Sequence, residues 1–379
     1  MDAQPGWQPD TDAPGCEAAC ESRPSGVRGA LWLSASILAI RHHAVLRVSK
    51  GKPNDGARPT MADVARELGV AKITVSRALS NHSTVKDSTR TLIRETAERM
   101  GYRLNVSARN LRQQRTRTIA VVIEMTPSHE RLMSEPYPLL LLGGILQELT
   151  AAGQNMVLTT IDLFSQAPPS ADGVILLGQG VHDDAAAVIE ATGLPYVVWG
   201  AEHGPPERIV VGSDNREGGR LAAEYLLDRG CRRLLFLGDA EHGEAEDRLR
   251  GFEAGLAGSD AAIAGNIPCA FTLAAGREAV APLLDGQSLD FDGIFASSDA
   301  IAMGAIEALQ ARGHAVPGDV SVVGFDDSPG AALFSPRLTS IRQDWGVGGE
   351  LLAQKVLDKV AGKAVTSRAM PVALIIRES

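Results

Sequence analysis

The stretch TMADVARELGVAKITVSRALSN, residues 60–81, constrains this chain more than any other part of its sequence. Its first half has apolar residues at the i, i+3, i+4 and i+7 spacing of a short amphipathic helix. These residues are Met61, Val64, Ala65 and Leu68. Thr60 stands at the N-cap position, and Gly69 breaks the helix. A second short helix is predicted from about residue 71 to residue 79.

The second predicted helix turns Val75 and Leu79 inward and leaves a polar, basic face outside. The residues of that outer face are Lys72, Ile73, Thr74, Ser76 and Arg77. Two short helices joined by a turn that contains Gly, with such an outer face on the second, indicate a helix-turn-helix. An ordinary αα-hairpin is the alternative that this stretch alone leaves open.

A third helix fits residues 87–100 and ends at Gly101. Its predicted apolar face consists of Leu92, Ile93, Thr96, Ala97 and Met100. The basic segment VSARNLRQQRTR that follows is mildly amphipathic but too short to form a stable helix alone in water.

Motifs within residues 63–111 resemble those of a known family. The matching motifs are DVA (63–65), GV (69–70), TVSR (74–77), Arg90, GY (101–102), Asn105 and SARNL (107–111). They are similar to the DNA-binding headpiece and hinge of the lactose-repressor/galactose-repressor (LacI/GalR) regulators. The resemblance implies a headpiece over 59–104, a hinge helix and linker over 105–117, and an effector-binding and dimerisation domain over 118–379.

The resemblance also implies which residues meet DNA. They are Thr60, Lys72, Ile73, Thr74, Ser76, Arg77, Asn81, Asn105, Ser107, Ala108 and Leu111. Arg77 has the donors for a bidentate contact to guanine, and Ile73 offers an apolar contact that suits a thymine methyl group. Leu111 is expected to act as a wedge in the minor groove once two hinge helices meet there.

Charge is distributed unevenly along the chain. The whole chain carries a formal charge of −9, which alone argues against nucleic-acid binding. Residues 59–117, however, hold twelve Lys and Arg against five Asp and Glu, a net +7, so the remainder carries −16. A basic module joined to an acidic body places the phosphate-binding surface at one end.

Residues 1–58 fit neither domain. Their first half is rich in Pro, Gly and acidic residues, which is typical of disorder. The apolar run 30–40 is too short to span a bilayer and makes a poor signal peptide. Cys16 and Cys20 have no His or second Cys pair nearby to complete a metal site, and Cys231 and Cys269 are isolated. We therefore expect a solvated or non-native extension, a cytoplasmic location, and no metal, cofactor or membrane partner.

Beyond residue 118 the pattern alternates between strand-like and helix-like runs, which predicts parallel sheets wrapped by helices. The predicted strands are 118–123, 155–160, 172–177, 195–199, 233–238, 291–296, 320–325 and 371–376. The predicted helices are 137–152, 183–192, 216–229, 246–257, 275–284, 299–313 and 346–361. The resemblance gives this body two doubly wound α/β subdomains like those of periplasmic sugar-binding proteins.

One connection departs from the family pattern. Only eleven residues, 161–171, separate two predicted strands where the family carries a full helix. That length is near the lower limit for a parallel crossover, so we expect no room for the usual helix and a thinned N-terminal subdomain.

Several residues are candidates for binding an effector at strand ends, where doubly wound sheets gather ligands. Asp326 and Arg248 match family residues that bind effector oxygens, and Arg248 is expected in the first turn of its helix, against the macrodipole. Asp326 could instead form a local turn. Phe271 and Trp345 match stacking positions, and Trp199 lies at a predicted strand end; ordinary core packing is the alternative for all three.

Three further positions complete the predicted site or limit what can be transferred from relatives. Glu124 ends the first strand and either contacts the ligand or is simply solvated. Ser298 and Gly200 stand where several relatives carry Asn and Asp, so the identity of the ligand cannot be copied from them. Asp214 and Asn215 are expected to cap the helix that follows.

Enzymes are the rival class, but nucleophile-elbow, phosphate-loop and zinc-protease motifs do not occur, and no catalytic residue is predicted. A sugar-binding protein without DNA binding is a weaker rival because of the headpiece. We predict a homodimeric transcriptional regulator, a repressor of a carbohydrate-use operon that binds a palindromic operator and a sugar-like effector. A purine or other metabolite is the alternative effector. Since no leucine heptad precedes Ser379, we expect no tetramer built on an added C-terminal helix.

Overall fold

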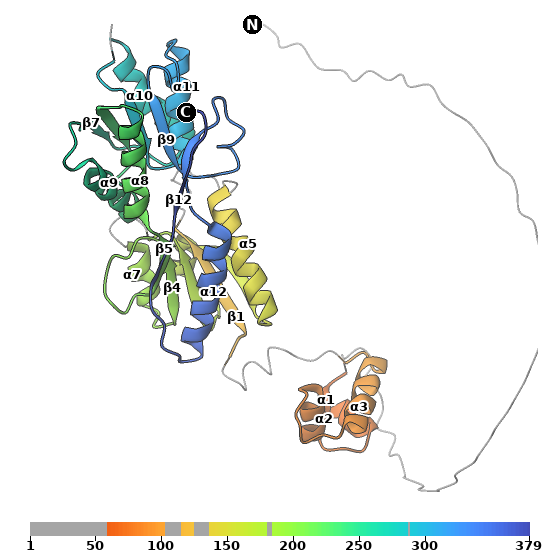
Figure 1. Cartoon of the computed structure of the whole chain (residues 1–379). Coiled ribbons are helices and arrows are strands. Elements are labelled where there is room, and N and C mark those ends of the chain that lie inside the picture. The colour runs from red at the N-terminus through yellow and green to blue at the C-terminus, as the bar shows by residue number, and fades with distance from the viewer. Residues whose placement is uncertain (1–58, 103–114, 125–135, 180–183, 287–288) are drawn as a thin grey trace, which may run out of the picture.

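The structure is a computed structural model that describes residues 59–102, 115–124, 136–179, 184–286 and 289–379 (Figure 1). The predictions for the extension 1–58 and for Asn105, Ser107, Ala108 and Leu111 lie outside these residues. Among the described residues, no helix has both the length and the apolar character that crossing a bilayer requires.

The first three helices form a small module with its own core. They are α1 (Met61–Glu67), α2 (Lys72–Leu79) and α3 (Asp87–Arg99). The predicted N-cap is confirmed: the Thr60 backbone N–H and hydroxyl donate to the Asp63 carboxylate at 2.9 and 2.7 Å. Gly69 makes the turn with φ +63°, a conformation that costs glycine little. Val64, Val75 and Ile93 are buried between the helices, as the apolar spacing predicts.

The prediction for Leu92 is wrong. Leu92 is 53% exposed, while Ile93, Thr96 and Ala97 are buried and Met100 packs against the same core. Ile93, Thr96, Ala97 and Met100 follow the i, i+3, i+4, i+7 pattern, so one face of α3 already fills the available space. Leu92 stands one position off that face and is left outside.

The body contains two six-stranded sheets. The N-terminal lobe has the order β11-β5-β4-β3-β1-β2, and the C-terminal lobe has the order β12-β10-β9-β8-β6-β7. All described neighbours are parallel except β10 and β12. The strands of the N-terminal lobe are β1 (Thr118–Ile123), β2 (Asn155–Thr160), β3 (Gly173–Leu177), β4 (Tyr196–Trp199), β5 (Val210–Ser213) and β11 (Arg368–Met370). Those of the C-terminal lobe are β6 (Arg233–Leu237), β7 (Ala262–Ile267), β8 (Gly293–Ala296), β9 (Ser321–Asp326), β10 (Thr339–Arg342) and β12 (Ala373–Ile375).

Helices cover both faces of each sheet, so each lobe has three layers (Figure 1). In the N-terminal lobe the helices are α5 (Pro136–Ala151) and α12 (Trp345–Val360) on one face, and α6 (Ile161–Gln166) and α7 (Asp184–Glu190) on the other. In the C-terminal lobe they are α8 (Asn215–Asp228) and α9 (Gly243–Leu256) on one face, and α10 (Leu273–Val280), the 3-10 helix η2 (Ala281–Leu284) and α11 (Asp299–Ala311) on the other. The chain therefore passes between the lobes three times, after β5, after β10 and after β11.

All eight predicted strands are present, but four others escaped prediction. They are β5, β7, β10 and β11. Each is short or poor in large apolar residues; β7 reads AIAGNI and alternates between exposed and half-buried positions at a sheet edge. Strands are predicted from runs of apolar residues, and the sequences of these four segments cannot be distinguished from loops by that criterion.

The short connection 161–171 contains a helix after all. The six residues of α6 bury Ile161 and Phe164 against the sheet. The connection leads from edge strand β2 past β1 to β3, and a helix of under two turns suffices for that path. Val157 and Leu158 on β2 and Leu163 on α6 remain exposed.

Candidate functional site

A cavity of about 470 Å³ lies between the two lobes. Its lining comes from the carboxyl ends of β1, β3, β4, β5, β6, β7, β9 and β10, and from the beginnings of three helices. Parallel strands bring their carboxyl ends to one edge of a sheet, and here the edges of both sheets face the same space. The volume is within the range of small-molecule sites.

The N-terminal lobe supplies both polar and aromatic surface. Glu124 follows β1, Gln179 follows β3, and Trp199 ends β4. Gln179 is buried, and its side-chain oxygen accepts a hydrogen bond of 2.7 Å from the Ala201 backbone N–H. Tyr137, in the first turn of α5, lines the same wall.

The C-terminal lobe supplies Asp239, His242, Glu244, Arg248, Phe271 and Asp326. The rings of His242 and Phe271 meet edge to face with centroids 5.7 Å apart. Burial and the nearby Asp239 carboxylate raise the pKa of the Cys269 thiol, which also lines the cavity, to about 11. This thiol therefore stays protonated near neutral pH and offers a weakly polar surface rather than a nucleophile.

Arg248 is held rigidly, although not as the sequence predicts. Helix α9 begins at Gly243, so Arg248 stands in its second turn, and the argument from an unfavourable first-turn position does not apply. The Arg248 side chain is buried; its Nε donates to Asn215 Oδ1 at 2.9 Å and its Nη1 donates to the Ser297 carbonyl oxygen. The guanidinium also lies 3.7 Å from the centroid of the Phe325 ring. Packing and hydrogen bonds together fix where its planar fork points.

A chain of hydrogen bonds crosses the cavity floor where the backbone passes between the lobes. The Ser213 hydroxyl donates to Gln343 Oε1 at 2.7 Å, and Gln343 Nε2 donates to Asp326 Oδ1 at 2.6 Å. Ser213 ends β5, while Gln343 follows β10, so two of the three crossings are joined to the predicted ligand residue. All three residues line the cavity.

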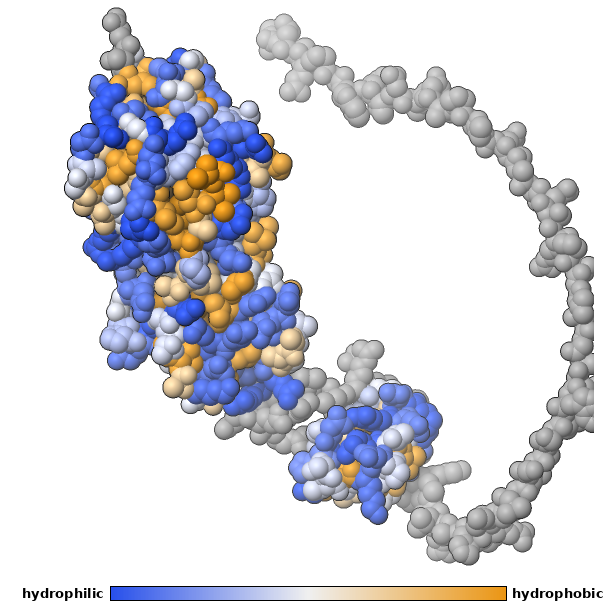
Figure 2. Space-filling view, in the orientation of Figure 1, coloured by the Kyte–Doolittle hydropathy of each residue, from blue (hydrophilic) through white to orange (hydrophobic). Residues whose placement is uncertain are grey.

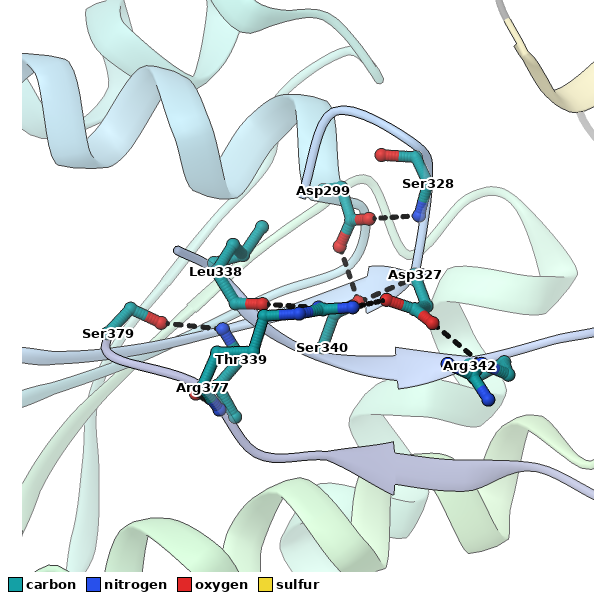
Figure 3. A network of polar contacts seen from close by, with 9 residues as sticks. All are labelled: Asp299, Asp327, Ser328, Leu338, Thr339, Ser340, Arg342, Arg377 and Ser379. Carbon is teal, nitrogen blue, oxygen red and sulfur yellow. Dashed lines mark hydrogen bonds and ion pairs between the residues drawn. The ribbon is translucent and has the colours of Figure 1, made fainter. Parts of the chain in front are cut away.

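The turn that presents Asp326 has strained backbone and is held by a polar network (Figure 3). Asp326 and Asp327 have φ of +124° and +51°, unfavourable values for residues with a side chain. Asp299 accepts from the Ser328 N–H at 2.6 Å and from the Ser340 hydroxyl, while Arg342 and Arg377 both pair with the Asp327 carboxylate. Asp327 therefore has a structural role, and Asp326 is the residue of the pair that lines the cavity.

The same network buries a second acid. Asp299 is fully enclosed at the start of α11, and burial, followed by the charge of Asp326, raises its pKa. The hydrogen bonds from Ser340 and Ser328 act in the opposite direction. The carboxylate of Asp299 thus ties the beginning of α11 to the turn that holds Asp326.

Five of the seven predicted effector residues line the cavity, and two do not. The five are Glu124, Trp199, Arg248, Phe271 and Asp326. Ser298 is instead the N-cap of α11, where its hydroxyl accepts from the Ile301 N–H at 3.3 Å. Trp345 is the first residue of α12; its side chain is buried in the core of the N-terminal lobe and meets the Tyr137 ring edge to face at 6.0 Å. Tyr137 is the aromatic residue that faces the cavity in that region.

Sequence reasoning missed several other lining residues. Among them are Tyr137, Gln179, Asn215, Asp239, His242, Glu244 and Gln343. The strand-end rule could have found Gln179 and Asp239, because each follows a predicted strand. The strand-end rule could not find Gln343, since β10 itself was not predicted. Asp214 caps α8 as expected, accepting from the Glu217 N–H at 3.0 Å, whereas Asn215 lies in the first turn and binds Arg248.

The headpiece offers a second candidate surface on α2. Lys72, Ile73 and Arg77 are exposed to solvent. Ile73 is 54% exposed although it is a large apolar residue. Thr74 and Ser76 are partly buried, and Thr60 is occupied with capping α1. Asn81, just past α2, has φ +57° and accepts a hydrogen bond from Arg94. This face of α2 therefore presents two basic side chains and one apolar side chain to a partner.

Two regions of the chain match known protein families. Residues 60–105 match the family described as bacterial regulatory proteins, lacI family, and residues 223–379 match a periplasmic binding protein-like domain. The transcriptional regulator CelR of Thermobifida fusca is 32% identical over 337 residues, covering 85% of this chain and 98% of the relative. The regulator GntR of Pseudomonas aeruginosa is 32% identical, covering 85% and 96%.

Solved structures show the same architecture. A complex of CelR with cellobiose is 30% identical, with a TM-score of 0.63 over 85% of this chain and all of the other. A lac repressor dimer bound to operator and the anti-inducer ONPF has a TM-score of 0.75 at 24% identity, covering 85% of this chain and 99% of the other. The second likeness supports the fold alone.

Proposed function

Because this chain belongs to the lacI family of bacterial regulatory proteins, a family of DNA-binding transcriptional regulators, we propose that it represses a carbohydrate-use operon in response to a sugar. It is a regulator and not an enzyme. In this proposal the headpiece reads a palindromic operator in the cytoplasm. The cavity between the lobes binds the effector, which changes the affinity for that operator.

The exposed face of α2 supports the assignment of the DNA-reading surface. Lys72, Ile73 and Arg77 project from a helix whose opposite side, Val75 and Ala78, is locked into the headpiece core. A recognition helix needs this combination, because a rigid inner face fixes the register of the outer side chains in the major groove. Arg77 is the residue suited to a bidentate guanine contact.

The balance of charge in the cavity supports a neutral effector. Among the described lining residues, four carboxylates, from Glu124, Asp239, Glu244 and Asp326, stand against one guanidinium, from Arg248. Two like charges 8 Å apart repel by about 2 kcal/mol at an effective dielectric constant of 20. A phosphate or carboxylate on the ligand would meet several such charges, whereas sugar hydroxyls donate to them.

Aromatic surface in the cavity supports a sugar in particular. Tyr137, Trp199 and Phe271 provide apolar faces next to the carboxylates and Arg248. A sugar ring has an apolar C–H face and a rim of hydroxyls, so it uses both kinds of surface at once. The cellobiose held by the CelR relative is a ligand of this kind. A purine also stacks on aromatic rings and is the competing class.

We propose that the protein acts as a homodimer. Large apolar residues are exposed on α5 (Leu139, Leu140, Leu146), on the adjoining edge strand β2 (Val157, Leu158) and on α6 (Leu163). Leu333 of the C-terminal lobe is 86% exposed. Figure 2 shows apolar patches among hydrophilic residues on both halves of the body. A second copy that covers these residues would explain their exposure and would pair two headpieces on a symmetric operator.

If the dimer forms through α5, a charged side chain placed on its exposed face should disrupt the dimer. Leu146→Glu should convert the dimer to a monomer at micromolar concentration, because it places a carboxylate in an apolar interface. Leu283→Glu, an equally drastic change at an exposed leucine of η2, should leave the dimer intact. Sedimentation velocity measures both, and an unchanged mass for Leu146→Glu would exclude α5 from the interface.

The operator prediction concerns Arg77. Selection from random duplexes should return an inverted repeat, and Arg77→Ala should weaken binding to it by about 1–3 kcal/mol and relax the preference at one base position. Arg66→Ala, which removes the same charge from α1, should change affinity only slightly and equally for all sequences. Equal losses for the two variants, with no relaxed position, would contradict the assignment.

The effector prediction is tested by a thermal-shift screen with cellobiose, other neutral sugars, glucose 6-phosphate, gluconate and hypoxanthine. A neutral sugar at about a hundred times its dissociation constant should raise the free energy of unfolding of the body by about 2.7 kcal/mol. That increase corresponds to a rise of about 5–10 °C in its melting temperature. Phe271→Ala should abolish that shift, while Tyr225→Ala, on α8 away from the cavity, should retain it. A response to phosphorylated sugar, gluconate or purine alone would overturn the neutral-sugar assignment.

A further inference from the structure

Asp172 binds the start of the body to the segment that leads to the headpiece. Its Oδ1 accepts hydrogen bonds from the Thr116 N–H at 2.6 Å and from the Thr116 hydroxyl at 2.9 Å. Its Oδ2 accepts a third from the Arg117 N–H at 2.8 Å. Hydrogen bonds to an ionised acceptor are among the stronger ones in proteins. One carboxylate therefore fixes two successive residues of the linker.

The linker is held there in a strained conformation. Arg117 has φ +52°, a left-handed value that is unfavourable for a residue with a side chain. Such a conformation persists only where surrounding contacts enforce it. At Arg117 those contacts are the bond from its N–H to Asp172 and the bond from the Asn155 N–H to its carbonyl oxygen, 2.8 Å.

Two strands connect this anchor directly to the cavity. β1 starts at Thr118, next to the anchored residues, and ends beside Glu124. β3 starts at Gly173, next to Asp172, and ends beside Gly178 and Gln179. The two strands pair in parallel from Ile119–Gly173 to Ile123–Leu177 without a register shift. Buried, hydrogen-bonded strands thus form a continuous connection between the cavity lining and the anchor.

We propose that Asp172 is a positioning residue for DNA binding, which fixes the linker to the N-terminal lobe so that the headpiece follows the state of the cavity. The part about the cavity rests on the proposed function. The part about operator binding rests only on DNA binding by the headpiece. Without the anchor, the two headpieces of a dimer lose their defined spacing and bind the operator at a greater cost in entropy.

The C-terminal lobe contains a matched arrangement that lacks the linker. Asp292 precedes Gly293 of β8 as Asp172 precedes Gly173 of β3, and its Oδ1 accepts from the Arg232 and Arg233 N–H groups at 2.8 and 2.9 Å. Arg232 and Arg233 follow α8, inside the body, and do not lead to the headpiece. Asp292→Asn is therefore a control for removing a carboxylate charge at the corresponding position of the other lobe.

The experiment compares Asp172→Asn, Asp292→Asn and the unchanged full-length protein. Both substitutions keep the size of the side chain and remove its charge. Asp172→Asn also replaces one of two accepting oxygens with an amide nitrogen, so its melting temperature should fall by more than that of Asp292→Asn, whose two hydrogen bonds both go to one oxygen. Asp172→Asn alone should weaken binding to the selected operator by about two- to thirtyfold, the range that corresponds to 0.5–2 kcal/mol of coupling. Binding to random duplex should stay the same, because each headpiece is intact.

A second measurement repeats the operator titration with saturating cellobiose as the probe. The ratio of affinities with and without cellobiose should be closer to one for Asp172→Asn than for Asp292→Asn. Unchanged operator affinity for Asp172→Asn, or an equal loss for Asp292→Asn, would overturn the proposal whatever cellobiose does. If cellobiose does not change the operator affinity of the unchanged protein, cellobiose is not the effector. The operator titration without cellobiose still tests the role of Asp172.

Discussion

The parallel alignment of strands in both sheets is the constraint on which the rest of the structure depends. It collects the strand ends that carry Glu124, Gln179, Trp199 and Asp326 around one cavity between the lobes. It also places the starts of β1 and β3, with the linker anchored to Asp172, at the opposite edge of the N-terminal sheet. Ligand and linker are thus at the two ends of the same buried strands, which is a geometry suited to coupling them.

The cavity floor shows how the two lobes are joined at the point where a ligand would bind. Ser213, Gln343 and Asp326 form one hydrogen-bonded chain across the crossings between the lobes. Beneath it, Asp299 and the two arginines on Asp327 hold the turn in a conformation that its sequence alone disfavours. Strained backbone of this kind is found where a side chain must be presented to a ligand in one orientation.

Local patterns were sufficient to predict the headpiece and the strands that have long apolar runs. The cap at Thr60, the turn at Gly69 and the buried Val75 all follow from short-range rules. They failed where packing decides between neighbours, as for Leu92, which lies one position outside a face that Ile93 already fills. They also failed for Trp345, because only the tertiary structure shows that its ring is buried against Tyr137, which itself lines the cavity. Residues at the end of an unpredicted strand, such as Gln343 after β10, could not be found from the strand pattern.

The central claim is that a sugar between the lobes and an operator at the headpiece bias the same equilibrium. Coupling between two binding sites is reciprocal, so the most direct measurement is calorimetry of the effector identified by the screen, titrated into free protein and into operator-bound protein. The two dissociation constants should differ by about fivefold or more, and by the factor by which the sugar changes operator affinity. Equal dissociation constants on and off the operator would contradict the account.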